Sequence, residues 1–200
     1  MSQERNLEKQ VVKVLETIKE IPFNEYKTND LTNEEKTKLI FNELLKEIPT
    51  LRPEEWEEIA EGLGKSKTSG KANEIKIYKV GAIKLLKGFA LKSNLHIAKD
   101  ANKIYLYDGK FWIEVEKELM KIFLGMAAVK MGIPGWLAEE KGFVDNLYEQ
   151  LEHAGFFEKM VNKNKTLINL GNGTLHISEE GIELKEFNAK DFLTHQLDFN

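Results

Sequence analysis

The chain has 200 residues, of which 42% are hydrophobic, and it contains no cysteine. This hydrophobic content is enough to build a buried core, either in one domain or in two small ones. The absence of cysteine excludes disulfide bonds, thiolate metal sites and cysteine nucleophiles. No apolar run approaches the roughly 18 residues of a membrane span, and the first residues lack the apolar segment of a secretion signal. We therefore expect a soluble, cytoplasmic protein with no membrane partner.

The formal net charge of −4 hides a strong segregation of charge along the chain. Residues 1–63 and residues 111–200 each carry a net charge of −6, whereas residues 64–110 carry +8. That middle segment has eleven lysines and three acidic residues. Such asymmetry indicates a polyanionic partner, although the isoelectric point of the whole chain is about 5.7.

Residues 1–63 are predicted to form an acidic bundle of three helices. In residues 4–21 apolar residues recur at the spacing of one helical face. The second helix begins with Thr32 and Glu35, which have the spacing of a capping box, and the helix ends before Pro49. The third helix begins at Pro53, because proline suits the first turn of a helix.

Residues 64–73 are predicted to form a basic, flexible linker, because they contain almost nothing that can be buried. A second domain then covers residues 74–200. Its expected elements, in chain order, are a strand at 75–78, a helix at 82–91, strands at 95–98, 104–107 and 111–115, helices at 116–131 and 143–154, and a C-terminal hairpin. Strands and helices mix locally without a repeated βαβ unit, so we predict a predominantly helical α+β fold in which β-hairpins flank helices.

The C-terminal stretch contains the clearest turn signal of the chain. Ile168 to Ile177 has the pattern of two strands, and Asn172-Gly173 between them is typical of a two-residue hairpin turn. A short amphipathic segment over residues 191–199 follows. A hairpin by itself does not indicate a function, but the order of these parts does.

Two motifs in this order resemble the helicase-associated N-terminal region of the poxvirus-type and phage/plasmid primase–helicase family. Tyr105-Leu-Tyr-Asp-Gly-Lys-Phe-Trp112 is similar to its Y-x-Y-D-G-x-x-W hairpin ahead of a helix. The second motif closes the region and is carried by Asn169, Asn172, Gly173, Leu175, Phe187, Asp191, Phe192, Leu193, Thr194 and Leu197. The resemblance covers about residues 95–200 and gives no guide to the first 90 residues.

The resemblance implies a non-motor part of a replicative DNA helicase or primase–helicase from a phage, plasmid or similar mobile element. In that family a hexameric superfamily 3 ATPase follows, so we expect the motor after Asn200, either in a longer protein or in a split one. ATP and magnesium are expected for that motor and not for this chain. The implied partners are DNA, single-stranded or forked, the helicase domain, and neighbouring subunits.

We predict no catalytic residues, metal site or cofactor in these 200 residues. Gly64-Lys65-Ser66 is not a phosphate-binding loop, because Ile59 stands where the loop needs its first glycine. No Asp-x-Asp occurs, so primase metal chemistry is not carried over. Glu149 and His153 are one helical turn apart and could supply two metal ligands, but a third ligand cannot be named.

The basic middle is the best candidate for a functional site. Its lysines could neutralise phosphates, and exposed aromatic rings among them could stack on bases. The candidate nucleic-acid-binding residues are Lys76, Lys79, Lys84, Lys87, Lys92, Lys99, Lys103, Tyr105, Tyr107 and Lys110. We expect Phe89 and Trp112 to be core residues, whereas Tyr105 and Tyr107 fit the core and the stacking role equally well.

The alternative is a protein–protein interaction module that recruits replication partners without touching DNA. In that case the lysines only keep the chain soluble. The acidic bundle and the helices at 116–154 would then bind a polymerase, a loader or a neighbouring subunit. A run of glutamates around Trp56 could dock a basic partner, although a solvated acidic face with one buried aromatic is the favoured interpretation.

Overall fold

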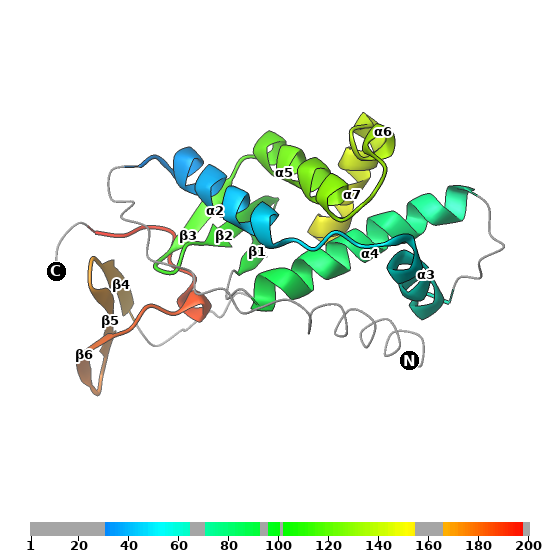
Figure 1. Ribbon diagram of the computed structural model, residues 1–200. Coiled ribbons are helices and arrows are strands. Elements are labelled where there is room, and N and C mark those ends of the chain that lie inside the picture. The colour runs from blue at the N-terminus through cyan, green and yellow to red at the C-terminus, as the bar shows by residue number, and fades with distance from the viewer. Residues whose placement is uncertain (1–30, 65–70, 93–95, 101, 155–165, 198–200) are drawn as a thin grey trace. The chain divides into compact units, whose positions relative to one another are not determined.

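The computed structural model describes residues 31–64, 71–92, 96–100, 102–154 and 166–197 (Figure 1). It has a mixed α+β fold with a large helical share and two three-stranded sheets, which confirms the predicted fold class. The helix predicted over residues 4–21 lies outside the described residues, so the three-helix acidic bundle stays a prediction. No helix in the described ranges is both long enough and apolar enough to cross a membrane.

The chain divides into two compact units whose segments alternate along the sequence. The first, here called the helical unit, comprises Met1–Pro22, Phe41–Asn94 and Lys117–Ala154. The second, here called the sheet unit, comprises Phe23–Ile40, Leu95–Glu116 and Gly155–Asn200. The sequence prediction instead separated domains at residues 64–73, and the existence of independently folding domains stays a prediction.

The helical unit is built around one long helix. Its helices are α3 (Pro53–Gly62), α4 (Lys71–Lys92), α5 (Lys117–Lys130), α6 (Gly135–Ala138) and α7 (Lys141–Ala154). The long helix α4 contacts α3 and α7, and α5 packs on α6 and α7 (Figure 1). Phe89, Phe123 and Phe143 are fully buried between these helices. Phe41 belongs to α2 (Asn33–Glu47), and its ring stacks on Phe123 with the centroids 4.1 Å apart.

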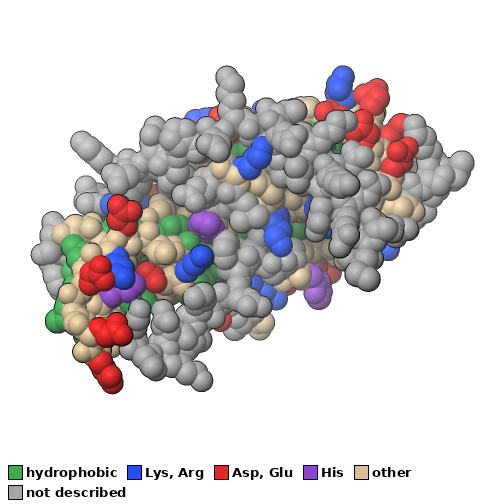
Figure 2. All heavy atoms as spheres, turned by 90° about the horizontal axis from the view of Figure 1, so that it is seen from below, with side chains coloured by type: hydrophobic (Ala, Val, Ile, Leu, Met, Phe, Trp, Pro, Cys, Tyr) green, Lys and Arg blue, Asp and Glu red, His purple; other side chains and the backbone are tan. Residues whose placement is uncertain are grey.

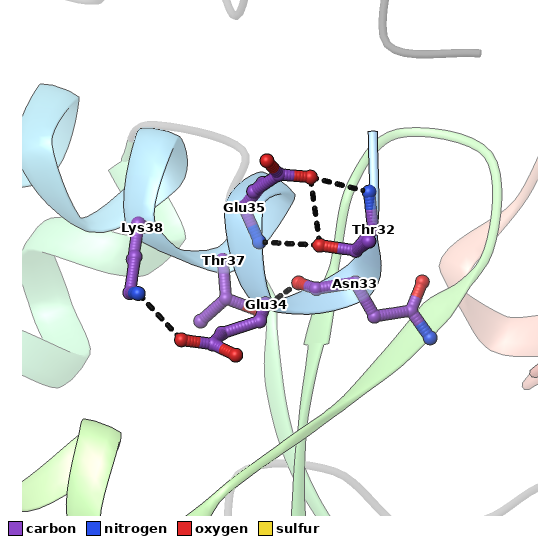
Figure 3. A network of polar contacts seen from close by, with 6 residues as sticks. All are labelled: Thr32, Asn33, Glu34, Glu35, Thr37 and Lys38. Atoms are coloured by element: carbon purple, nitrogen blue, oxygen red, sulfur yellow. Dashed lines mark hydrogen bonds and ion pairs between the residues drawn. The ribbon is translucent and has the colours of Figure 1, made fainter. Parts of the chain in front are cut away.

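The predicted capping box at the start of α2 is present (Figure 3). The Thr32 backbone N–H donates to Glu35 Oε2 at 2.9 Å, and the Glu35 N–H donates to Thr32 Oγ1 at 3.3 Å. The hydrogen bond from the Thr32 backbone lowers the pKa of the Glu35 carboxyl. The first backbone N–H groups of a helix have no partner within it, and these two side chains each accept a hydrogen bond from one of them. The start of α2 could therefore be predicted from Thr32 and Glu35.

Trp56 fixes α3 to the rest of the helical unit. Its ring is buried, and its Nε1–H donates to the Met131 backbone oxygen at 3.1 Å. The same oxygen accepts from the Leu51 N–H at 3.2 Å, and the Tyr78 ring meets Trp56 edge-on with centroids 5.0 Å apart. The expectation that Trp56 anchors its helix from the core side is therefore confirmed.

The strand predicted at residues 75–78 is wrong, because these residues lie inside α4. Ile75 and Ile77 alternate as in a strand, but Ile75 and Tyr78 are three residues apart and share a helical face. Packing of Tyr78 on Trp56 is a contact that the sequence pattern does not show. Residues 71–73 of the predicted linker also belong to α4, while residues 65–70 lie outside the described residues.

The sheet unit contains two antiparallel three-stranded sheets. The first consists of β1 (Ile97–Asp100), β2 (Lys103–Tyr107) and β3 (Trp112–Val115), and the second of β4 (Thr166–Leu170), β5 (Gly173–Ser178) and β6 (Gly181–Lys185). A 3-10 turn, η1 (Ala189–Asp191), follows. Both predicted hairpins are confirmed. β6 was not predicted, because its five residues are all exposed and include two charges.

The turn between β4 and β5 lies one residue earlier than predicted. Leu170 pairs with Gly173, so the turn residues are Gly171 and Asn172. Gly173 begins β5 with a φ of 155°. A Cβ atom on Gly173 would lie 2.5 Å from the Lys185 backbone oxygen, so glycine is needed there for the close approach of β6 as well as for its φ.

Two helical glycines should respond in opposite ways to substitution by alanine. At Gly81 an added Cβ would lie 2.8 Å from the Trp56 ring, which is held by its hydrogen bond to Met131. We expect Gly81→Ala to destabilise the fold by about 1–3 kcal/mol, the usual cost of overpacking.

At Gly125 the atom nearest to an added Cβ would be Ala138 O at 3.4 Å, so Gly125→Ala should stabilise the fold by roughly 0.5–1 kcal/mol through helix propensity. Urea unfolding followed by circular dichroism measures both changes, and a stabilised Gly81→Ala variant would contradict the packing around Gly81.

Candidate nucleic-acid interface and the motif contacts

Five of the ten predicted site residues lie on α4 in the helical unit. Four of these lysines occupy an arc of about 140° at 3.6 residues per turn, namely Lys76, Lys79, Lys84 and Lys87. We call these four the lysine row. Lys92 lies outside this arc, and the opposite side of the helix buries Leu85 and Phe89. The row arises because α4 turns its apolar side to the core and its lysines away from it.

The lysine row has little acidic compensation on its own helix. Glu74 is the one acidic residue in the α4 sequence, and its Oε1 accepts a 2.9 Å hydrogen bond from the Tyr78 hydroxyl. Burial, followed by this hydrogen bond, raises the pKa of Tyr78 to about 12. The Lys79 ammonium lies over the Phe143 ring at 5.9 Å, where the ring face favours a cation.

The other five predicted site residues lie in the sheet unit, so the structure does not place the ten in one unit. Lys99 is on β1, Lys103 is on β2 and Lys110 is in the following turn. The Lys103 ammonium is 2.7 Å from Glu114 Oε2, and this hydrogen bond raises the lysine pKa. Its charge is therefore already compensated within the first sheet.

Tyr105 and Tyr107 lie on one face of β2, and that face is turned to the core. Tyr107 is only 7% exposed and clusters with Ala98 and Trp112, while Tyr105 meets Phe192 edge-on at 5.4 Å. Burial raises the pKa of the Tyr107 hydroxyl. In this conformation the Tyr107 ring cannot offer a base a stacking platform. The expected core positions of Phe89 and Trp112 are confirmed, each side chain being 1% exposed.

The two sequence motifs meet at Trp112. Its indole N–H donates to the Ala189 backbone oxygen at 2.8 Å, and its backbone N–H donates to Leu193 O at 2.7 Å. The Phe192 ring stacks on the indole at 4.9 Å. Phe192 has a φ of 47° and is the one non-glycine residue with positive φ in the described part of the chain. The contact with Trp112 holds Phe192 in this uncommon conformation.

Asn169 makes a second link between the motifs. Its side chain is buried, and Nδ2 donates to the Lys110 backbone oxygen at 3.1 Å. Its backbone oxygen accepts from the Leu197 N–H at 2.9 Å, and the Gln196 side chain donates to Leu170 O at the same distance. The C-terminal segment, residues 188–197, is thus attached to Trp112 at one end and to β4 at the other.

A family model described as D5 N-terminal-like matches residues 89–200 of the chain. The chain belongs to this D5 N-terminal-like family. The match contains both motifs and confirms the resemblance to the N-terminal region of D5-type primase–helicase proteins. No curated protein and no solved structure matches the chain.

Sequence reasoning missed one pair in the D5 N-terminal-like segment. His176 Nε2 and Asp191 Oδ2 lie 3.7 Å apart, and both side chains are mostly buried. His176 lies on β5, whereas its partner comes from η1, fifteen residues later. Among the described residues no three His, Asp or Glu side chains gather as metal ligands, and Glu149 with His153 on α7 acquires no third member there.

Acidic side chains gather over the second sheet of the D5 N-terminal-like segment (Figure 2). Glu179, Glu180, Glu183 and Glu186 are all exposed there. A face of this charge repels phosphates, so α4 is the better candidate for DNA contact.

Replacing Trp112 by phenylalanine should loosen the C-terminal segment specifically. The variant keeps an aromatic ring for Phe192 but removes the donor to Ala189 O, so we expect a loss of about 1 kcal/mol in stability. Hydrogen exchange of the Leu197 amide should become faster, because that amide is bonded at the other end of the segment.

Trp56→Phe is the matched control, since it also removes an indole donor to a backbone oxygen, but in the helical unit. It should leave exchange at Leu197 unchanged. Equal acceleration in the two variants would show that the segment does not depend on Trp112.

Proposed function

We propose that this chain is the non-motor N-terminal region of a phage- or plasmid-type replicative DNA helicase or primase–helicase, and that it binds DNA and supports oligomer assembly in the cytoplasm. Family membership supports the replication context. The lysine row of α4 is the observation that carries the DNA-binding role. ATP hydrolysis with magnesium belongs to the motor of the parent protein, and this chain acts by binding alone.

The lysine row is long enough to follow a nucleic-acid backbone. Lys76 and Lys87 are eleven residues apart, which is about 16 Å along a helix. At about 3.4 Å of axial rise per nucleotide on one strand, this length covers roughly five phosphates.

The mode of binding is electrostatic and therefore independent of sequence. Each lysine that neutralises a phosphate releases a condensed counterion, so affinity falls as salt is added. Recognition of bases by stacking is not available at Tyr107, whose ring is buried. We accordingly propose that the chain holds the backbone and leaves base recognition to other parts of the replication machinery.

A protein-interaction module without DNA contact is the second candidate. It is favoured by the acidic exposed side of α3, where Glu54, Glu57 and Glu61 are open to solvent. In that case binding of a partner protein, and not of DNA, should respond to changes on α3.

Charge reversal in the lysine row should abolish most DNA binding. Lys76→Glu combined with Lys84→Glu places two negative charges where phosphates would lie, so single-strand affinity should fall by about tenfold or more, with a weaker dependence on salt. Fluorescence anisotropy of a labelled single strand and a matching duplex, titrated at several salt concentrations, measures this. The unmodified chain should lose roughly 100-fold in affinity between 50 and 200 mM salt if five phosphates are neutralised.

The control variant is Lys117→Glu with Lys141→Glu. It makes the same charge change in the helical unit, at exposed positions in the first turns of α5 and α7, where a glutamate suits the helix N-terminus. If both double variants bind DNA as the unmodified chain does, the row is not the site. The interaction module then becomes the better description.

A further inference from the structure

A group of buried polar atoms without hydrogen-bond partners lies beside η1. The Asp191 side chain is 11% exposed, and its Oδ2 atom accepts no hydrogen bond from the described residues. The His176 side chain on β5 is 15% exposed, and neither ring nitrogen has a hydrogen-bond partner there. Asp191 Oδ2 and His176 Nε2 are 3.7 Å apart, which is too far for a hydrogen bond. Because burial of polar groups without hydrogen bonds costs free energy, this arrangement needs an explanation.

The Tyr107 hydroxyl is the third member of this group. Tyr107 is 7% exposed, and its hydroxyl has no hydrogen-bond partner in the described part of the chain. Burial raises the pKa of the hydroxyl, and the negative charges of Asp108 and Asp191 raise it further. The hydroxyl therefore keeps its proton and stays neutral. Asp191 thus lies within electrostatic range of β2 in the first sheet as well as of His176 in the second.

The other charged groups that face His176 come from β6. Glu183 is the cross-strand partner of His176, and Lys185, two residues further along β6, lies on the same face of the sheet. The Lys185 ammonium is 3.0 Å from Glu183 Oε2, so these two charges compensate each other. On β4 the partner of His176 is the apolar Leu167. Among the described residues, Asp191 is therefore the carboxylate near the ring that lacks a cation of its own.

Two further titratable side chains lie close to this group. Lys190 adjoins Asp191 in η1, but it is exposed, so water screens its charge. The His96 ring meets the Tyr107 ring at 5.9 Å, and burial lowers the pKa of His96. His96 is therefore neutral at pH values where an ordinary histidine is still protonated.

We propose that a proton on His176 attaches η1 to β5, so that this pair is a pH-sensitive latch for the C-terminal segment. A neutral imidazole carries one N–H, whereas the imidazolium carries two and a positive charge. The proton thus gives the buried Asp191 carboxylate a partner of opposite charge. A movement of about 1 Å shortens the 3.7 Å separation to that of a charge-assisted hydrogen bond. This inference goes beyond the proposed function and does not depend on DNA binding.

The latch acts at the middle of a segment whose other contacts do not titrate. On one side of Asp191 the Trp112 indole donates to Ala189 O, and on the other the Trp112 backbone N–H donates to Leu193 O. The Leu197 N–H donates to the backbone of β4. Protonation of His176 therefore adds a link between η1 and the second sheet, and the link is lost as the pH rises and the proton leaves.

NMR spectroscopy of the unmodified chain is the first test. The ring resonances of His176, followed from about pH 5 to 8, where histidine ordinarily changes charge, give its protonated fraction. Hydrogen exchange of the Trp112 amide, which is bonded to Leu193 O, measures opening of the segment. After correction for the exchange rate of an unfolded chain at each pH, protection of this amide should fall about tenfold as His176 loses its proton. Constant protection, or a change whose midpoint differs from that of the His176 titration, would overturn the latch.

Three variants identify the groups responsible. Asp191→Asn removes the carboxylate charge and His176→Asn removes the titrating ring, so each should abolish the pH dependence of Trp112 protection. His195→Asn is the matched control, because His195 belongs to the same segment but is exposed. It should keep the full tenfold change. If the change survives in His176→Asn, another group such as His96 is responsible and the latch is wrong. The titration of the unmodified chain decides the matter even if a variant does not fold.

Discussion

The attachment of the C-terminal segment to Trp112 holds the sheet unit together. Each sheet has only three short strands, so its stability depends on the apolar face that it can bury. Trp112 supplies the link with one backbone and one side-chain hydrogen bond, and its ring stacks on Phe192. The same residues are those that define the family motifs. Packing thus gives a physical reason for the two motifs to occur together, since each provides a contact surface for the other.

The apolar side of α4 explains both the core of the helical unit and the position of the lysine row. α4 is 22 residues long, and it packs against α3 and α7. Once Leu85 and Phe89 are buried, the lysines of the row lie on the other side of α4. Hydrophobic packing of the helix therefore positions the positive charge. A row of this kind holds a flexible polyanion well, because it tolerates any sequence.

Local signals in the sequence predicted much of the fold, and longer-range contacts account for what was missed. The capping box at Thr32, Pro53 at the start of α3 and the glycine-rich turns act within four residues, so they could be read directly. Residues 75–78 were assigned to a strand because the packing of Tyr78 on Trp56 is not visible in the sequence. The prediction of the candidate site was limited by the same kind of long-range contact. Four of its lysines lie in one row on α4, but the burial of Tyr107 and the pairing of His176 with Asp191 involve η1 and the segment around it.

The exposed apolar residues of α5 show why composition alone could not separate a DNA-binding role from an assembly role. Periodicity marks Ile122, Met126 and Val129 as apolar positions, but only the packed helices show that α6 and α7 leave them open. Because these residues and the lysine row are on different helices of one unit, the two roles need not use the same residues.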